Sequence, residues 1–140
     1  IGVYNNYSQI GAEPGGSFTG ADFSIAPDNE PPDSAITSIT DGATIPGLQA
    51  IAGLAGDNIG VNGLEAAMED AATGLWWNAQ EGQWVTSTTG PLFGDARAVL
   101  QGPPNDLNWT LRADAGDGAL ANLASNLVTG GNYKIYIRAR

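Results

Sequence analysis

Apolar and polar residues alternate with a period of two in parts of the chain, and this period predicts β-strands. The clearest case is 107–112, where Leu107, Trp109 and Leu111 share one face and polar residues share the other. Other short runs of β-prone residues, bounded by turn-forming Gly, Pro, Asp and Asn, predict further strands. These runs lie at 35–40, 47–53, 64–70, 75–78, 83–86, 96–100 and 131–140. The pattern therefore predicts an all-β fold whose strands bury one face.

Two of these segments need local arguments. Residues 64–70 contain Glu, Ala and Met, which favour helix, but glycine-containing turns on both sides limit the run to the length of a strand. Residues 75–78 and 83–86 are separated by four residues, 79–82, and this length predicts a β-hairpin.

The two ends of the chain differ in character. Residues 1–26 are polar, aromatic and glycine-rich without a helical period, and we expect them to be extended. Residues 27–33 form a proline-rich acidic connector, because a residue that precedes proline is restricted to extended conformations. At the other end, 131–140 predicts a strand with no returning partner after it. Such a strand has an open edge, whose unpaired N–H and C=O groups can pair with another chain.

Composition narrows the range of functions. The 140 residues suit one domain, and 20 Gly and 8 Pro with only 14% charged residues suit many turns and short strands. Fifteen acidic and five basic residues give a net charge of -10, which disfavours nucleic acids and anionic membrane surfaces as partners. Cys and His are absent, which removes thiolate and imidazole chemistry and the usual zinc ligands.

Location also follows from composition. The sequence contains no apolar run long enough to span a membrane, so we expect no membrane insertion. The Thr/Ser/Asn/Gly-rich and lysine-poor composition resembles that of exported bacterial surface proteins. We therefore expect an extracellular or cell-surface location.

A succession of short motifs resembles the bacterial immunoglobulin-like domains of surface adhesins and secreted multidomain proteins. The resemblance covers roughly residues 31 to 140. The motifs are Pro31-Pro32, Ile36-Thr37-Ser38, Asp41-Gly42-Ala43-Thr44-Ile45, Ile51-Ala52-Gly53, Asp57-Asn58-Ile59-Gly60-Val61, Thr73-Gly74-Leu75-Trp76-Trp77-Asn78, Trp84, Trp109-Thr110, Tyr133 and Ile137-Arg138-Ala139.

The resemblance implies an immunoglobulin-like β-sandwich of about seven strands over residues 34–140. It also implies that 131–139 corresponds to the penultimate strand, which in that family precedes an acidic residue, a turn and a final strand. Here Arg140 stands at the place of the acidic residue. Two explanations remain open: the chain is a piece of a longer protein, or the last strand comes from elsewhere.

The second explanation predicts donor-strand complementation, in which an extended segment completes the sheet of another domain. The acceptor edge would consist of Tyr133, Ile135 and Ile137. Copies that donate to one another head to tail would form a pilus-like filament, whereas insertion into the same chain would give a monomer. Two donor segments remain open, one in the first ten residues and one in 17–26. The candidate donor residues are Ile1, Val3, Tyr7, Phe18, Phe23 and Ile25.

Calcium is a candidate ligand, and no other cofactor is expected. Asp28 and Glu30 in the connector, with Asp57 and Asn58 in a loop expected at the same end of the sandwich, offer the oxygen ligands that Ca²⁺ takes in extracellular modules. The alternative is that these side chains form a solvated acidic surface.

Aromatic residues suggest an alternative function, an adhesion or carbohydrate-binding module of a larger secreted or surface protein. Trp76, Trp77 and Trp84 lie on the predicted hairpin, where an exposed ring could stack on a sugar of a cell-surface glycan. Alternation sends only one of Trp76 and Trp77 inward, and the outward ring could instead pack on the adjoining strand or on the next subunit. No enzyme is expected, because carboxylates such as Glu65 and Glu69 on one strand do not face each other across a cleft.

Overall fold

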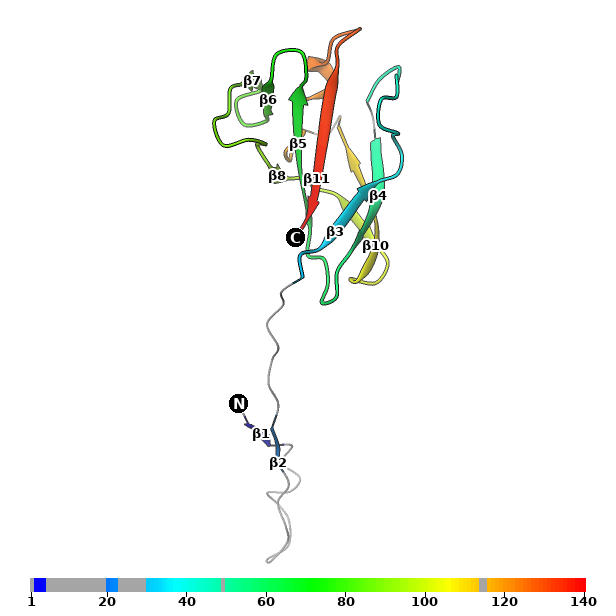
Figure 1. Ribbon diagram of the computed structural model, residues 1–140, viewed down its shortest axis with the longest axis vertical. Helices are drawn as coiled ribbons and strands as arrows, with labels where there is room; N and C mark the ends of the chain where they lie inside the picture. Colours follow the sequence, from blue (N-terminus) through cyan, green and yellow to red (C-terminus); the bar gives the residue numbers. More distant parts are fainter. Residues whose placement is uncertain (1, 5–19, 23–29, 49, 114–115) are drawn as a thin grey trace, which may run out of the picture.

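The computed structural model describes residues 2–4, 20–22, 30–48, 50–113 and 116–140, and β-strands make up nearly all of the regular secondary structure of these residues (Figure 1). Two antiparallel sheets form a β-sandwich, as predicted. The first sheet has the order β3 (Asp33–Ile36), β4 (Ala50–Gly56), β10 (Asp106–Arg112), β9 (Val99–Gln101). The second has the order β11 (Tyr133–Ala139), β5 (Leu64–Asp70), β6 (Leu75–Asn78), β7 (Gln83–Val85), and β8 (Gly94–Asp95) also pairs with β5.

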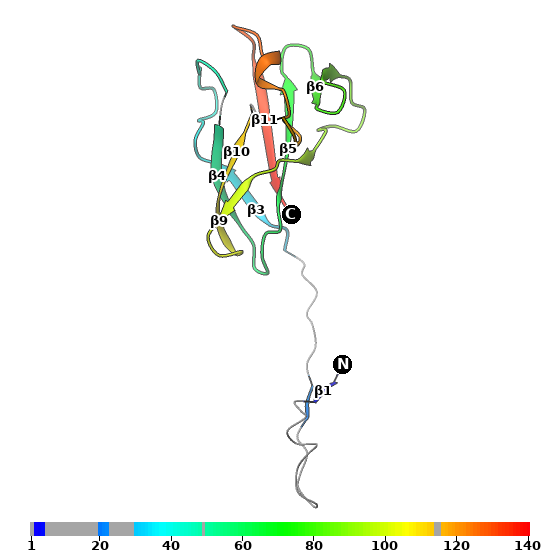
Figure 2. The same ribbon diagram turned by 180° about the vertical axis from the view of Figure 1, so that it is seen from behind.

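Two short elements lie outside these sheets. β1 (Gly2–Tyr4) and β2 (Gly20–Asp22) form a two-stranded antiparallel sheet of their own, which both views show beyond one end of the sandwich (Figures 1 and 2). A 3-10 helix, η1 (Ala124–Asn126), lies in the connection between β10 and β11.

The centre of the core is the contact between β10 and β4. Burial alternates along all seven residues of β10, with Leu107, Trp109 and Leu111 only 4%, 1% and 1% exposed, as the sequence predicts. Trp109 lies opposite Gly53 of β4, and its indole N–H donates to the Leu54 carbonyl at 2.9 Å. A side chain at Gly53 would collide with the neighbouring strand and with this ring, because a Cβ atom there would lie 1.9 Å from the Ala35 carbonyl oxygen and 2.4 Å from a Trp109 ring carbon.

β5 and the β6–β7 hairpin have the bounds that the sequence predicts, apart from one residue at the end of β7. Leu64, Ala66 and Met68 of β5 enter the core, which shows that burial between neighbouring strands outweighs the helix propensity of this segment. In the hairpin turn, the Asn78 side-chain oxygen accepts hydrogen bonds from the N–H groups of Gln80 and Glu81.

Apart from small differences at the ends of β10 and β11, three predicted strands have different bounds in the structure. The strand predicted at 35–40 is β3, which ends at Ile36 because the N–H groups of Thr37 and Ser38 both turn to the Ala52 carbonyl. β3 begins at Asp33, so this residue belongs to the sandwich and not to the connector.

The strand predicted at 47–53 is shifted to β4, Ala50–Gly56, whose register with β10 places Ile51, Gly53 and Ala55 opposite that strand's buried residues. The strand predicted at 96–100 begins only at Val99. Arg97 interrupts it, because this residue has a φ of 53° and its N–H donates to the Asp95 carboxylate at 2.8 Å. Alternation alone does not reveal such a left-handed residue.

The contact between Gly53 and Trp109 makes a testable prediction. Gly53→Ala should lower the free energy of unfolding by about 1–3 kcal/mol, the usual cost of overpacking a core. Gly47→Ala is the matched control: no atom lies within 4 Å of its added Cβ, and we expect a change within about 0.5 kcal/mol. Urea unfolding followed by tryptophan fluorescence measures both, and equal stabilities would contradict the packing described.

Candidate functional site

The candidate site is the edge of β11 that faces away from β5. β11 pairs with β5 from Tyr133 opposite Asp70 to Ala139 opposite Leu64. Arg140 extends this ladder, since its N–H and C=O both bond to Gly63. In an antiparallel ladder, residues with this mutual bonding alternate with residues that turn their peptide groups the other way. Even-numbered residues of β11 therefore bond to β5, and odd-numbered residues turn N–H and C=O to the opposite edge.

No strand pairs with that opposite edge within the part of the chain that the structure describes. The odd-numbered residues, which we call the edge residues, also turn their side chains toward the core, where each is only half-buried. The inward side chains of β10, by contrast, are almost completely buried. The core is therefore incompletely covered along this edge. The edge residues are Tyr133, Ile135, Ile137 and Ala139.

β3 lies beside β11 across the gap between the two sheets (Figures 1 and 2). The Ser34 hydroxyl of β3 donates to the Ile137 carbonyl at 3.3 Å, and Ile36 is half-buried against the same core. Among the described residues, this is the one hydrogen bond to the outward peptide groups of the edge residues. Ser34 thus replaces one of several hydrogen bonds that a neighbouring strand would make.

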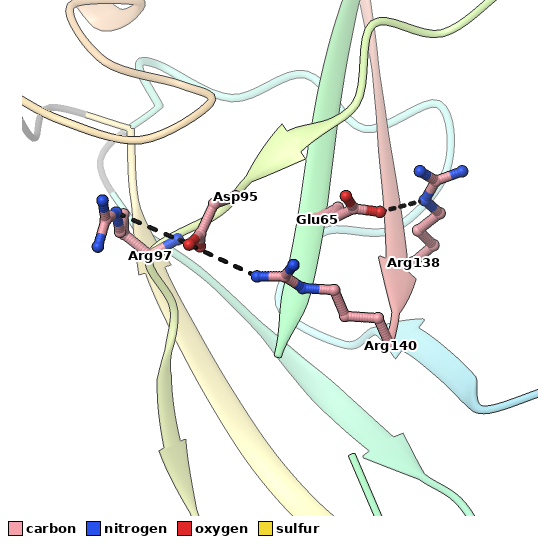
Figure 3. A network of polar contacts seen from close by, with 5 residues as sticks. All are labelled: Glu65, Asp95, Arg97, Arg138 and Arg140. Carbon is pink, nitrogen blue, oxygen red and sulfur yellow. Dashed lines mark hydrogen bonds and ion pairs between the residues drawn. The ribbon is translucent and has the colours of Figure 1, made fainter. Parts of the chain in front are cut away.

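The outer face of β11 is basic. Lys134, Arg138 and Arg140, three of the five basic residues in the chain, lie at even-numbered positions and are exposed; we call them the basic stripe. Figure 3 shows the Arg138 guanidinium paired with Glu65 of β5, and the same guanidinium lies 4.1 Å from the ring centre of Phe93. The Arg140 guanidinium reaches Asp95 at 3.6 Å.

A tyrosine lies between these cations. The Tyr136 hydroxyl donates to the Glu69 carboxylate at 2.9 Å. This hydrogen bond raises the pKa of Tyr136 because it stabilises the neutral phenol, and partial burial and the charge of Glu69 raise it further. Glu69 lies opposite Lys134 in the ladder, so the Glu69 carboxylate accepts from Tyr136 while Lys134 remains exposed.

The three tryptophans of the proposed glycan contact are largely covered. Trp77 is 2% exposed and donates its indole N–H to the Ala121 carbonyl at 3.0 Å. Trp76 points to the opposite face, as alternation predicts, but is only 8% exposed because Tyr136 packs on it at 5.4 Å between ring centres. Trp84 is half-buried and stacks on Tyr133 at 5.6 Å. Burial leaves Trp76 and Trp77 without the open ring face that stacking on a sugar requires.

The candidate calcium ligands do not converge in the part of the chain that the structure describes. One Asp57 carboxylate oxygen accepts from the N–H groups of Ile59 and Gly60 at 3.0 and 2.8 Å, and the other is buried without a hydrogen-bond partner. Glu30 and Asn58 are exposed, and Asp28 lies outside the described residues. No group of three or more acidic side chains gathers there. Asp57 caps its own turn, and calcium binding stays a prediction.

Most candidate donor residues lie outside the described residues: Ile1, Tyr7, Phe18, Phe23 and Ile25. Val3 is in β1, opposite Ala21 of β2. The residues of the predicted acceptor edge lie on the edge strand β11, and their role as an acceptor stays a prediction. The structure adds Ser34 and the basic stripe, which sequence reasoning missed although the even spacing of 134, 138 and 140 contained the signal for the stripe.

Comparisons with known proteins do not identify the chain: no protein-family model, curated protein or solved structure matches it. Within the described ranges, no helix combines the length and apolar character needed to cross a membrane.

The hydrogen bond between Tyr136 and Glu69 predicts a shifted titration. The folded state favours the neutral phenol, so the Tyr136–Glu69 hydrogen bond contributes fully to the stability of the fold below the usual tyrosine pKa near 10. This contribution is lost as the pH rises through the raised pKa of Tyr136. Glu69→Gln should move the Tyr136 pKa back toward 10. Phenolate absorbance during a pH titration, with Tyr136→Phe subtracted, measures this value. Glu81→Gln in the hairpin turn is the control, and an unchanged Tyr136 pKa in Glu69→Gln would contradict the assignment.

Proposed function

We propose that this protein is a structural subunit of an extracellular filament, in which the N-terminal segment of one copy pairs with the β11 edge of the next. One observation carries the proposal: the edge residues combine outward-facing peptide groups with half-buried apolar side chains. A donated strand would bond to the peptide groups and cover the side chains at the same time.

The order of the strands supports an immunoglobulin-like sandwich with a vacancy at this position. In that fold one sheet has the order A-B-E-D, and the last strand, G, lies beside strand F of the sheet that contains C. The order β3-β4-β10-β9 corresponds to A-B-E-D, and β11 beside β5 corresponds to F beside C. The free edge of β11 is then the position of strand G.

The free energy gained when a donated strand fills this position is large enough to hold the strand there. Complete burial of one aliphatic or aromatic side chain contributes roughly 1.5–3 kcal/mol. A donated strand would bury its own inward side chains and complete the burial of the edge residues. New main-chain hydrogen bonds would add about 0.5–1.5 kcal/mol each.

The connector supports donation to a neighbour over insertion into the same chain. A donor that returned to its own β11 would have to reverse direction between residue 26 and the start of β3 at Asp33. Pro27, Pro31 and Pro32 disfavour such a turn because they keep the preceding residues extended. β1 and β2 also lie away from β11 in both views (Figures 1 and 2). Donation from each copy to the next gives an open head-to-tail filament.

The proposal predicts that assembly depends on the N-terminal segment. Replacing residues 1–26 by a Gly/Ser segment of equal length should leave a folded monomer, because every core residue found among the described residues lies after residue 33. Light scattering after size-exclusion chromatography and negative-stain electron microscopy measure assembly, and circular dichroism checks the fold. Adding a peptide of residues 1–30 should raise the melting temperature of this variant, since ligand binding to the folded state stabilises it.

The control peptide has the same composition in scrambled order, and it should have no effect on melting. Filaments of unchanged length and number in the Gly/Ser variant would refute the proposal.

A further inference from the structure

We propose that the donor strand is residues 19–25, and that the basic stripe of β11 selects this segment through Asp22. The inference rests on the proposed function and decides between the two donor segments that the sequence leaves open.

Charge distinguishes the two segments. The first ten residues contain no charged side chain, whereas residues 1–33 as a whole contain five acidic residues, Glu13, Asp22, Asp28, Glu30 and Asp33, and no basic one. A strand that places Ala21, Phe23 and Ile25 toward the core must place Asp22 on the opposite face, because side chains alternate. A strand built on Ile1, Val3 and Tyr7 presents Gly2, Tyr4 and Asn6 on that face instead.

The acceptor presents the complementary charge on the same face. Side chains directly opposite each other on paired strands have Cβ atoms about 4.5–5.5 Å apart, so outward residues of the donor lie beside outward residues of β11. These outward residues include the whole basic stripe. An acidic residue at the centre of the donor therefore meets cations there, whatever the direction of the donor strand.

Lys134 is the cation best placed for this contact. Arg138 is paired with Glu65 and Arg140 with Asp95, whereas Lys134 makes no ion pair within the described residues and its ladder partner Glu69 accepts from Tyr136. The rest of the chain disfavours an acidic segment, because the net charge is -10. The basic stripe thus attracts the acidic donor to the same edge at which the apolar side chains of the donor can be buried against the incompletely covered core.

The end of the segment fits as well. In an antiparallel pair with β11, the donor residues with inward side chains are also those whose peptide groups turn to β11. Pro27 has no N–H to donate, so regular pairing ends after Ile25. β2 already places Gly20–Asp22 in an extended strand, and within the described residues only one of its edges has a partner, β1.

Disulfide trapping tests the identity of the donor, since the chain has no cysteine of its own. One chain carries a single cysteine at an outward donor position, Gly20→Cys or Ser24→Cys, and another carries Asn132→Cys, which leaves Lys134 in place. The two are mixed, assembled and oxidised, and non-reducing gels then detect linked pairs. The matched controls place the donor cysteine in the other segment, as Tyr4→Cys or Asn6→Cys.

We expect linked pairs from positions 20 and 24 and few from positions 4 and 6. Linked pairs mainly from positions 4 and 6, or filaments without linked pairs from either segment, would overturn the choice of donor. Neither result would contradict the proposed filament function. Absence of assembly in the unmodified chain would overturn the proposed function itself, so the two failures are distinguishable.

A charge exchange tests selection by the basic stripe. Asp22→Lys and Lys134→Glu should each slow assembly by about two- to fivefold at low ionic strength, the factor that corresponds to a surface ion pair. The double variant should recover most of the rate, and salt should reduce the differences. Asp41→Lys, an exposed residue in the β3–β4 connection, changes the net charge as Asp22→Lys does and is the control. Equal rates in Asp41→Lys and Asp22→Lys, or no recovery in the double variant, would overturn the role of the stripe.

Discussion

The geometry of a β-strand links two properties of β11 on which the rest of the structure depends. The residues whose side chains point to the core are the same residues whose peptide groups point to the free edge. Tyr133, Ile135, Ile137 and Ala139 therefore have half-covered side chains and outward-facing N–H and C=O groups together. β3 cannot complete both, because it belongs to the other sheet and reaches β11 through the Ser34 hydroxyl.

The sandwich tolerates this incomplete edge because its centre is closed elsewhere. Trp109 fills the space above Gly53, and its indole N–H is satisfied by the Leu54 carbonyl, so the largest side chain of the core leaves no unpaired polar atom. A second aromatic group, Trp77, Trp84 and Tyr133, packs where the β6–β7 hairpin meets the start of β11. The uncovered part of the core is thus confined to one margin, and that margin begins at an aromatic residue which is already fixed in place.

Much of the fold follows from period-two alternation, and the departures have physical causes. Strong alternation at Leu107, Trp109 and Leu111 predicts β10, and the half-buried edge of β11 follows from its position at the end of the strand order. Alternation reports the face of a side chain but not what covers it. It therefore sends one of Trp76 and Trp77 outward but does not reveal that Tyr136 covers Trp76. An expected position at the same end of the sandwich as the acidic connector likewise does not predict that the Asp57 carboxylate turns to its own loop.

The ladder between β11 and β5 also has a mechanical consequence. It runs antiparallel over all seven residues of each strand, from Tyr133 opposite Asp70 to Ala139 opposite Leu64. A pull along the strand axis stretches the hydrogen bonds of such a ladder together, in shear, whereas a pull across it breaks them one after another. In a chain of linked subunits, tension would reach β11 along its length. The strand that we propose to capture a neighbour would then be the one best oriented to carry load.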